Sequence, residues 1–389
     1  MKRPTYHRNL SFGITVFLLM CPASVSSQGF DRSVRSSEFF EAAIPTDQQD
    51  ARADKRLKQL HSKRNKRPNI VWIVVDDMGY GDPGCYGGGV AIGASTPNMN
   101  ALAAGGLRLT SCYSQQTCTP TRSAILTGRL PVRTGLTRPI LAGDKITKNP
   151  WADETSLPSV LSEAGYFTLL TGKWHVGESE GMRPHDVGFD EYYGYYSAQK
   201  EITQRIDTRR YPGLTLNPQR LADYEAVGPS DALIHGFKNG ETSEISRVKS
   251  TEDMGKADEV LTQHTIAKIK ELAKSGQPFF IEHCFMKVHA DNFAHPDFAG
   301  KSEAKYPYKD AIHEVDHHVG SITKAIQESG LVENTLIFLT SDNGPQMDAW
   351  PDAGYTPFRG AKGTTFEGGV RVPGIAYWPG MIEAGQTKD

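Results

Sequence analysis

The sequence predicts an α/β protein with a mostly parallel central sheet and helices on both of its faces. From Pro68 onward, short apolar runs rich in β-branched and aromatic residues alternate with longer segments of helical periodicity. The apolar runs are continuous instead of alternating with polar residues, which is typical of strands buried on both sides. The 389 residues, 38% of them hydrophobic, suffice for one large core or two domains.

Four apolar runs are predicted as strands. The first, NIVWIVV at residues 69–75, carries no charge and leads straight into Asp76. The other three are residues 166–170, 279–284 and 335–339. Because helical segments separate these runs, the strands are expected to lie parallel, joined by crossover helices.

Four segments are predicted as helices, and they are residues 95–105, 157–164, 257–274 and 308–329. Ser95, Thr96 and Pro97 begin the first helix, and Gly105 ends it. Gly165 stops the second. Residues 200–250 show no clear period, so we expect them to form a long insertion over one edge of the sheet.

The N-terminal 67 residues are expected to lie outside this fold. Basic residues precede an apolar run at residues 10–20, and small residues follow it, a pattern typical of a secretory signal peptide. We therefore expect a signal peptide at residues 1–27 and a disordered basic leader at residues 28–67. The apolar run is too short to span a bilayer, so the predicted location is the periplasm or the outside of the cell.

The overall composition argues against two classes of partner. The formal net charge is -2, which is not expected of a nucleic-acid binder or of a protein that binds membrane surfaces through charge. The five cysteines show no spacing that indicates a zinc site or a disulfide framework.

The most informative stretch is CTPTRSAILTG at residues 118–128. Cys118 and Arg122 are four residues apart, and Pro120 between them suits the first turn of a helix. Cys118 would then lie at the positive end of that helix, where an anion is favoured. The alternative is a buried cysteine beside a solvated arginine.

Polar side chains follow each predicted strand at the edge of the sheet where α/β proteins bind ligands. They are Asp76 and Asp77, Lys173 and His175, His289, and Asp342 and Asn343. Three carboxylates and an amide would form an all-oxygen site for Ca²⁺ or Mg²⁺, and the flexible coordination of Ca²⁺ favours that ion. Lys362 lies in a cationic, glycine-rich loop where backbone could approach an anion. Each motif alone could be a solvated turn.

Six motifs in this order resemble the sulfatase family, within the alkaline-phosphatase-like superfamily, and are most similar to bacterial arylsulfatases. The motifs are Asp76-Asp77, CTPTR at 118–122, GKWH at 172–175, PFF at 278–280 with His289 eleven residues after Pro278, SDNG at 341–344 and TPFRGAKGTTFEGGVRVP at 356–373. Together they cover the chain from about residue 68 to residue 380. The resemblance implies hydrolysis of aryl sulfates or sulfated carbohydrates.

The resemblance also implies a role for each site residue. Ca²⁺ would be bound by Asp76, Asp77, Cys118, Asp342 and Asn343. A maturation enzyme would oxidise Cys118 to formylglycine, whose hydrate is the nucleophile. Arg122, Lys173 and Lys362 would hold the sulfate, and His175 and His289 would carry protons.

The resemblance further implies how the chain is divided. Residues 68–389 would form the catalytic α/β domain, and the small C-terminal domain that usually follows it in relatives would be missing. Two alternatives remain open. One is hydrolysis of phosphate or phosphonate esters on the same scaffold, and the other is an inactive protein that binds sulfated polysaccharide.

Overall fold

The structure is a computed structural model that describes residues 47–64, 67–141, 144, 146, 148–207, 209–215, 217–219, 222 and 231–389. The predicted signal peptide at residues 1–27 lies outside the described residues. Residues 56–389 form one compact unit. In the parts of the chain just given, no helix is both long enough and apolar enough to cross a membrane.

Part of the predicted disordered leader is a helix, α1 (Asp47–Arg64), so the prediction is wrong for these residues. The segment DQQDARADKRLKQLHSKR is rich in alanine, glutamine, lysine, arginine and leucine, which are strong helix formers. Asp47 and Asp50 lie in the first turn, where negative charge favours the helix dipole. Charge runs of mixed sign with good helix formers therefore do not indicate disorder by themselves.

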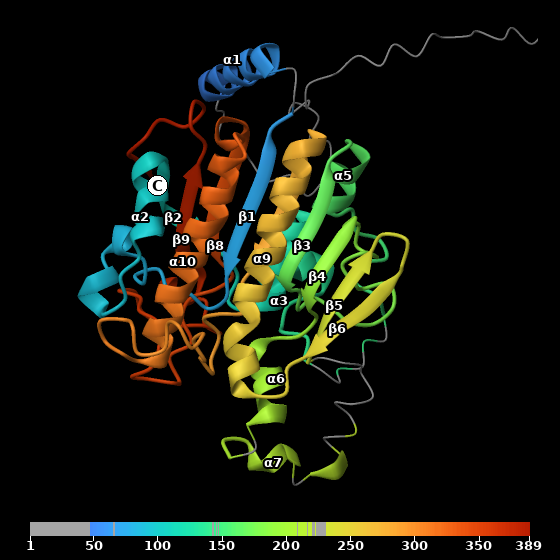
Figure 1. The fold of residues 1–389 in the computed structure, drawn as a ribbon, viewed down its shortest axis with the longest axis vertical. Coiled ribbons are helices and arrows are strands. Elements are labelled where there is room, and N and C mark those ends of the chain that lie inside the picture. The colour runs from blue at the N-terminus through green and yellow to red at the C-terminus, as the bar shows by residue number, and fades with distance from the viewer. Residues whose placement is uncertain are drawn as a thin grey trace, which may run out of the picture. The chain divides into compact units, whose positions relative to one another are not determined.

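The described strands form a single ten-stranded sheet in the order β10-β2-β9-β8-β1-β7-β3-β4-β5-β6 (Figure 1). The strands are β1 (Asn69–Val75), β2 (Leu107–Tyr113), β3 (Phe167–Lys173), β4 (Glu191–Tyr195), β5 (Ala232–Phe237), β6 (Thr242–Arg247), β7 (Phe279–Cys284), β8 (Thr335–Ser341), β9 (Arg371–Tyr377) and β10 (Gln386–Lys388). The central run from β8 to β4 is parallel throughout. Antiparallel pairs join β9 to β2 and β8, and join β5 to β4 and β6. This arrangement confirms the predicted α/β class.

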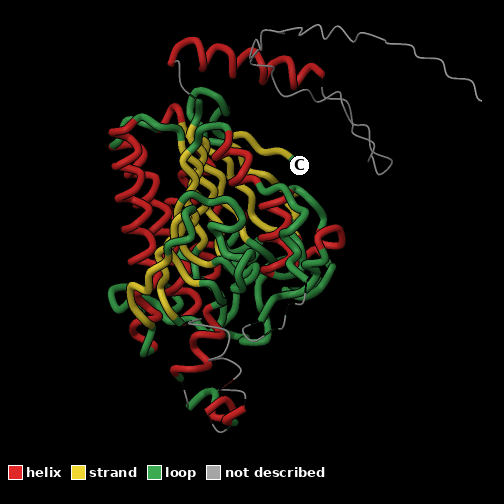
Figure 2. Tube along the Cα trace, turned by 90° about the vertical axis from the view of Figure 1, so that its right-hand side faces the viewer, coloured by secondary structure: helices red, strands yellow, loops and turns green. Residues whose placement is uncertain are grey.

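Helices lie on both faces of the sheet, as predicted. The α-helices are α2 (Pro97–Gly105), α3 (Cys118–Thr127), α4 (Pro131–Thr134), α5 (Leu157–Glu163), α6 (Gln199–Ile206), α7 (Pro212–Thr215), α9 (Thr251–Ser275), α10 (Pro307–Glu328) and α11 (Glu367–Val370), and the 3-10 helices are η1 (Gly84–Tyr86), η2 (Gly89–Ile92) and η3 (Val332–Asn334). The long helices α9 and α10 cross one face, and shorter helices and loops cover the other (Figures 1 and 2).

The central strands are apolar on both sides because each side belongs to a different core. In β7, Ile281 packs into the cluster that includes α9 and α10 residues, whereas Phe280 packs into the cluster under α3 and α5. Successive residues of a strand point to opposite faces, so this division follows from the strand geometry. The continuous apolar runs in the sequence have this physical cause.

The segment at residues 200–250 differs from the prediction. Instead of only covering an edge, it extends the sheet by two antiparallel strands, β5 and β6. All six residues of β6 are exposed, so its sequence lacks the apolar alternation that marks a half-buried strand. Pattern reasoning could not have found this edge strand.

A buried carboxyl group in the centre of the sheet generates the first prediction. Burial raises the pKa of Glu282 to about 7, and one of its oxygens has no hydrogen-bond partner. In the unfolded chain the carboxyl group of Glu282 ionises near pH 4.5, whereas in the folded protein it stays protonated up to about pH 7. The protein therefore loses stability as the pH rises from about 4.5 to about 7.

Replacing Glu282 with Gln should remove this loss. Relative to the parent, the free energy of unfolding of Glu282→Gln should grow between pH 5 and pH 7 and then level off, by about 3 kcal/mol in total. Urea unfolding at several pH values measures it. The exposed Glu163→Gln is the matched control, and a difference that does not vary with pH would contradict the prediction.

Candidate active site

The two pairs of polar residues predicted to meet at the sheet edge, Asp76–Asp77 and Asp342–Asn343, do so. Strands β1 and β8 are parallel neighbours with Val75 opposite Ser341, so both chains leave the sheet side by side. The amide N–H of Asp77 donates to Oδ1 of Asp342 at 3.1 Å. Nδ2 of Asn343 donates to Oδ1 of Asp77 at 2.7 Å. Side chains about 265 positions apart in sequence are thus in direct contact.

Helix α3 points its N-terminus at this cluster. Cys118 is its first residue, and Sγ lies 3.6 Å from Oδ1 of Asp76. Arg122, one turn later, donates from Nε and Nη2 to Oδ2 of Asp342 at 3.1 and 2.9 Å. Its side chain is only 2% exposed, so Arg122 belongs to the buried cluster and is not a solvated arginine.

Two lysines complete the cluster. Nζ of Lys173, the last residue of β3, lies 2.6 Å from Oδ2 of Asp76. Nζ of Lys362 lies 2.7 Å from Asp77. Gly172 permits the approach of β3 to β7, because its φ is 102° and a Cβ there would lie 1.8 Å from the carbonyl oxygen of Cys284.

Each of the three carboxylates is therefore paired with at least one cation, and Asp76 also lies 3.8 Å from Nη2 of Arg122. Burial works to raise the pKa of Asp77, but Lys362 and His289 outweigh it and the pKa lies below its usual value. Burial likewise works to lower the pKa of Lys173, and Asp76 reverses this shift. Three negative and three positive charges balance within the cluster, so the carboxylates could hold a divalent cation while the cations hold an anion.

Two histidines face the same space. His175 is buried, and neither of its ring nitrogens has a hydrogen-bond partner. Burial, followed by Lys173 and Arg122, holds its pKa well below the usual value, so the ring is neutral. Nδ1 of His289 lies 2.6 Å from the carbonyl oxygen of Ala290, and Nε2 lies 3.8 Å from Oδ2 of Asp77. Burial and then Lys362 lower the pKa of His289 to about 3.

Backbone strain also collects here. Asp77 and His175 adopt φ values of 61° and 57°, which are uncommon for residues other than glycine. Such conformations persist where the surrounding structure holds them, and they cluster at functional sites.

The chemistry of the donor set fits a hard divalent cation. Ligand atoms of Asp76, Asp77, Asp342 and Cys118 all lie within 4.8 Å of one another. Oδ1 of Asn343 is buried without a hydrogen-bond partner, although its amide nitrogen is satisfied. A buried, unpaired acceptor beside three carboxylates is the arrangement that an oxygen-preferring metal ion would satisfy.

The state of Cys118 bears on its chemistry. The side chain is 1% exposed, and burial raises the pKa of its thiol, with Asp342 adding to the effect. A protonated thiol is a poor nucleophile. The unmodified cysteine is therefore not activated in the way that a cysteine hydrolase requires.

A cavity of about 280 Å³ opens above the cluster. Its walls include Cys118, His175, His289 and Lys362, together with Pro139, Leu141, Ala198, Lys200, Glu201 and Gln204. The α6 residues among them were not identified from the sequence, because nothing in their spacing distinguishes them from other helical positions. Lys287, two residues before His289, points elsewhere and pairs with Glu314 at 2.8 Å.

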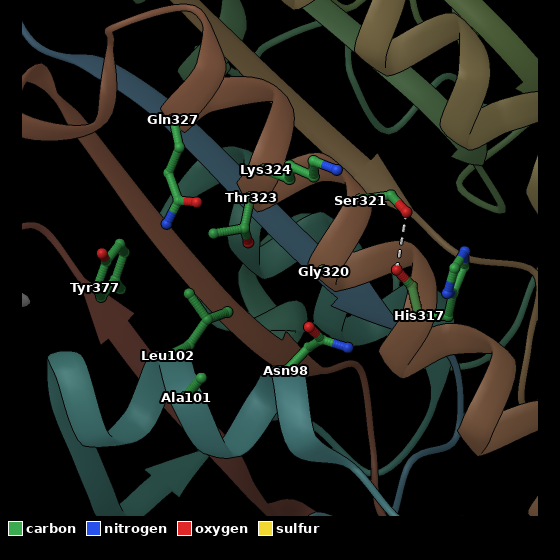
Figure 3. A pocket seen from close by; sticks show the side chains of 10 residues that line it. All are labelled: Asn98, Ala101, Leu102, His317, Gly320, Ser321, Thr323, Lys324, Gln327 and Tyr377. Carbon is green, nitrogen blue, oxygen red and sulfur yellow. Dashed lines mark hydrogen bonds between the residues drawn. The ribbon is translucent and has the colours of Figure 1, made fainter.

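A larger hollow lies away from the cluster, in the groove between α2 and α10 (Figure 3). It measures about 440 Å³ and is lined by residues such as Asn98, Lys324 and Gln327. None of the predicted site residues lines it. Four of them, Cys118, His175, His289 and Lys362, line the smaller cavity at the carboxyl edge of the sheet instead.

The sheet topology and this polar edge define a protein of the alkaline-phosphatase-like superfamily. The Sulfatase family model matches residues 68–389, and the chain belongs to the sulfatase family. N-acetylgalactosamine-6-sulfatase of Canis lupus familiaris is 35% identical over 331 residues, covering 82% of this chain and 59% of its own length. Arylsulfatase A of Homo sapiens is 35% identical, covering 83% and 61%.

Comparison with solved structures also finds proteins of this fold. The sulfatase PsFucS1 from Pseudoalteromonas sp. is 51% identical with a TM-score of 0.85, and the match covers 89% of this chain and 69% of that one. A phosphonate monoester hydrolase of Agrobacterium radiobacter shares the fold, at 20% identity and a TM-score of 0.51 over 82% of this chain and 70% of that one. The chain thus spans about three fifths of the length of the curated relatives given above.

The donor set generates the second prediction. Adding Ca²⁺ to metal-free protein should raise the midpoint of thermal unfolding, because a ligand that binds only the folded state stabilises it. Asp77→Asn should lose most of this rise, since it removes one of the carboxylates that would hold the ion. Differential scanning calorimetry with and without Ca²⁺ measures it. The control is the exposed Asp348→Asn, and an equal rise in both variants would contradict the assignment.

Proposed function

We propose that this protein hydrolyses sulfate esters at the site formed by Cys118, Arg122, Lys173, His175, His289 and Lys362. One observation carries the proposal. The N-terminus of α3 brings Cys118 against three carboxylates and three cations in a buried, charge-balanced cluster. A tetrahedral oxyanion such as the sulfate group of an ester, together with a divalent metal ion, is the pair that such a cluster suits.

We assign the metal ligands as Asp76, Asp77, Asp342, Asn343 and the modified residue 118, and the ion as Ca²⁺. The all-oxygen donors support a hard cation, and the flexible coordination of Ca²⁺ leaves positions for substrate oxygens. A bound Ca²⁺ would neutralise charge on the sulfate group as it builds in the transition state.

Three cations would bind the sulfate group. Arg122, Lys173 and Lys362 lie around the Sγ position and are held there by the carboxylates. Because they are fixed before substrate binds, they need no reorganisation during the reaction. Lys362 also lines the open cavity, so it would contact the ester directly.

Residue 118 would supply the nucleophile after oxidation of the cysteine to formylglycine. The hydrate of that aldehyde offers one hydroxyl to attack sulfur and a second whose deprotonation releases sulfate. Asp342, which accepts hydrogen bonds from Arg122, would assist the first deprotonation, and His175 would take the second proton. The raised pKa of the Cys118 thiol supports this assignment, because the unmodified group is not activated.

His289 would donate a proton to the departing alcohol or phenol oxygen. Its Nδ1 is fixed against the carbonyl oxygen of Ala290, so Nε2 faces the cavity. A sulfate group placed against Lys362 would offset the positive charge that disfavours the imidazolium form. Substrate binding would therefore shift His289 toward the charged form that can donate the proton, against the effect of burial.

A sulfated carbohydrate is the substrate class we favour. Lys200 and Gln204 from α6 line the cavity, where they could contact hydroxyl or further sulfate groups of a sugar. The 27% identical structure of Ps i-CgsB was solved in complex with k-i-k-neocarrahexaose. The N-acetylgalactosamine-6-sulfatases among the relatives act on a sugar sulfate by their name.

We further propose export to the periplasm or the medium and modification of Cys118 by a formylglycine-generating enzyme.

Hydrolysis of phosphate or phosphonate esters is the second candidate, because the same cations suit those anions and a phosphonate monoester hydrolase shares the fold. Turnover of paired aryl sulfate and aryl phosphate esters separates the two. A higher kcat/KM for the phosphate would favour the alternative.

The third prediction concerns Cys118. Cys118→Ala should abolish turnover of an aryl sulfate, because no other group can supply the covalent nucleophile. Sulfate binding should persist, since Arg122, Lys173 and Lys362 remain, and the loss of stability should be only on the order of 1 kcal/mol. Turnover by the variant close to that of the parent would overturn the mechanism.

The control for this experiment is chemical. Mass spectrometry of the peptide that carries residue 118 reports the formylglycine fraction of the parent. Activity should scale with that fraction across preparations. Isothermal titration with sulfate then shows whether the Ala variant retains the anion site.

The fourth prediction concerns His289. His289→Gln should lower kcat for an alkyl or sugar sulfate by about 10²- to 10⁴-fold, because a poor leaving group needs the proton. The loss should be much smaller for 4-nitrophenyl sulfate, whose phenolate leaves unaided. The control is His317→Gln, the same change on α10 outside the cavity. Equal losses of kcat for both substrates would show that His289 does not protonate the leaving group.

A further inference from the structure

A second cluster of metal-ligating side chains lies outside the candidate active site. It contains Glu191, His235 and His264, whose ligand atoms all lie within 4.8 Å of one another. Nε2 of His235 is 3.0 Å from Oε1 of Glu191, and Nε2 of His264 is 2.9 Å from the same oxygen. Two imidazoles thus converge on one carboxylate oxygen.

The three residues come from three rigid elements. Glu191 begins β4, His235 lies in the antiparallel neighbour β5, and His264 lies on α9. The rings of Tyr193 and His264 stack with centroids 4.0 Å apart, which fixes the imidazole. Donors held by strands and a helix keep their geometry without a bound ligand, as a metal site requires.

The cluster is separate from the candidate active site. Glu191 pairs with Leu169, near the start of β3, whereas Lys173 ends that strand at the catalytic edge. Four residues of strand correspond to about 13 Å. None of the three residues lines the cavity above Cys118.

The donor chemistry differs from that of the oxygen-only cluster. Two imidazole nitrogens and one carboxylate are ligands that suit Zn²⁺ and related transition metals, and they do not suit Ca²⁺. In a tetrahedral zinc site with bonds of about 2.0–2.1 Å, neighbouring ligand atoms lie about 3.3 Å apart. The observed separations of 2.9 and 3.0 Å are close to that value.

The surrounding charges allow a cation to bind. Nζ of Lys268 lies 2.9 Å from Oε2 of Glu191 and 3.0 Å from Glu271, so Oε1 remains the oxygen that faces the histidines. With neutral imidazoles, two carboxylates and one ammonium leave a net charge of −1. The side chains of His235 and His264 are 24% and 19% exposed, which leaves a side open for a water ligand.

We propose that Glu191, His235 and His264 bind a Zn²⁺ ion that ties the antiparallel edge of the sheet to α9. The ion would take Nε2 of each histidine and Oε1 of Glu191, with water as the fourth ligand. Lys268 would orient the carboxylate from its other oxygen, as groups around a metal centre do. The competing interpretation is a hydrogen-bonded trio in which both Nε2–H groups donate to Oε1.

Metal content of the full chain tests the proposal. The protein is dialysed against Zn²⁺ in the presence of excess Ca²⁺, and zinc per chain is measured by inductively coupled plasma mass spectrometry. The parent should retain about one equivalent more than either His235→Gln or His264→Gln. His317→Gln is the matched control and should equal the parent. Equal zinc in the parent and all three variants would overturn the proposal.

A second measurement tests the proposal even if His235→Gln or His264→Gln fails to fold. Co²⁺ bound to the parent in place of Zn²⁺ should give the visible absorption bands of a nitrogen- and oxygen-ligated tetrahedral ion. Zn²⁺ should also raise the midpoint of thermal unfolding of the parent and of His317→Gln but not of the other two. A parent with neither the bands nor the rise would establish the hydrogen-bonded trio instead.

Discussion

Three carboxylates and three cations share a buried space at the carboxyl edge of the sheet, and each carboxylate lies against at least one cation. Removing any single member would leave an uncompensated buried charge, which costs far more than the pair contributes. The positions of β1, β8, β3, α3 and the loop at Lys362 therefore depend on one another. The cluster holds the ends of these elements together and keeps three cations aimed at the same point.

The same balance would let the proposed site accept ions with little rearrangement. The carboxylates hold the cations in place, and ligand atoms of the three carboxylates and Cys118 lie within 4.8 Å of one another. Oδ1 of Asn343 and both ring nitrogens of His175 are left without partners inside the protein. Unsatisfied polar atoms are rare in a core, and here they gather where ligand and substrate would bind.

Much of the fold and of the candidate site could be predicted from the sequence, and the structure shows the physical causes of the patterns used. The run at 69–75 is apolar because β1 has a core on each side, and its bounds were predicted to the residue. Asp76 and Asp342 could be placed together because parallel strands end at one edge.

Other parts of the fold and of the second cluster have no sequence pattern that predicts them. Strand β6 is wholly exposed, so no apolar alternation marks it. Glu191, His235 and His264 meet only because β5 pairs with β4 in one register and α9 packs over that pair. Their separations in sequence carry no signal of this contact. The charge run at Asp47–Arg64 suggested disorder, whereas the helix propensity of its residues favours the helix that forms there.

The burial of Cys118 has a consequence for the order of events during synthesis. Its sulfur is enclosed by Asp76, already made, and by Asp342 and Lys362, which emerge from the ribosome more than 200 residues later. At ordinary rates of synthesis this interval lasts on the order of tens of seconds. During that time the cysteine is accessible on a chain that cannot yet close over it. Any enzyme that modifies Cys118 would therefore compete with folding, and the fraction of chains that it reaches would be a kinetic quantity that the speed of translation helps to set.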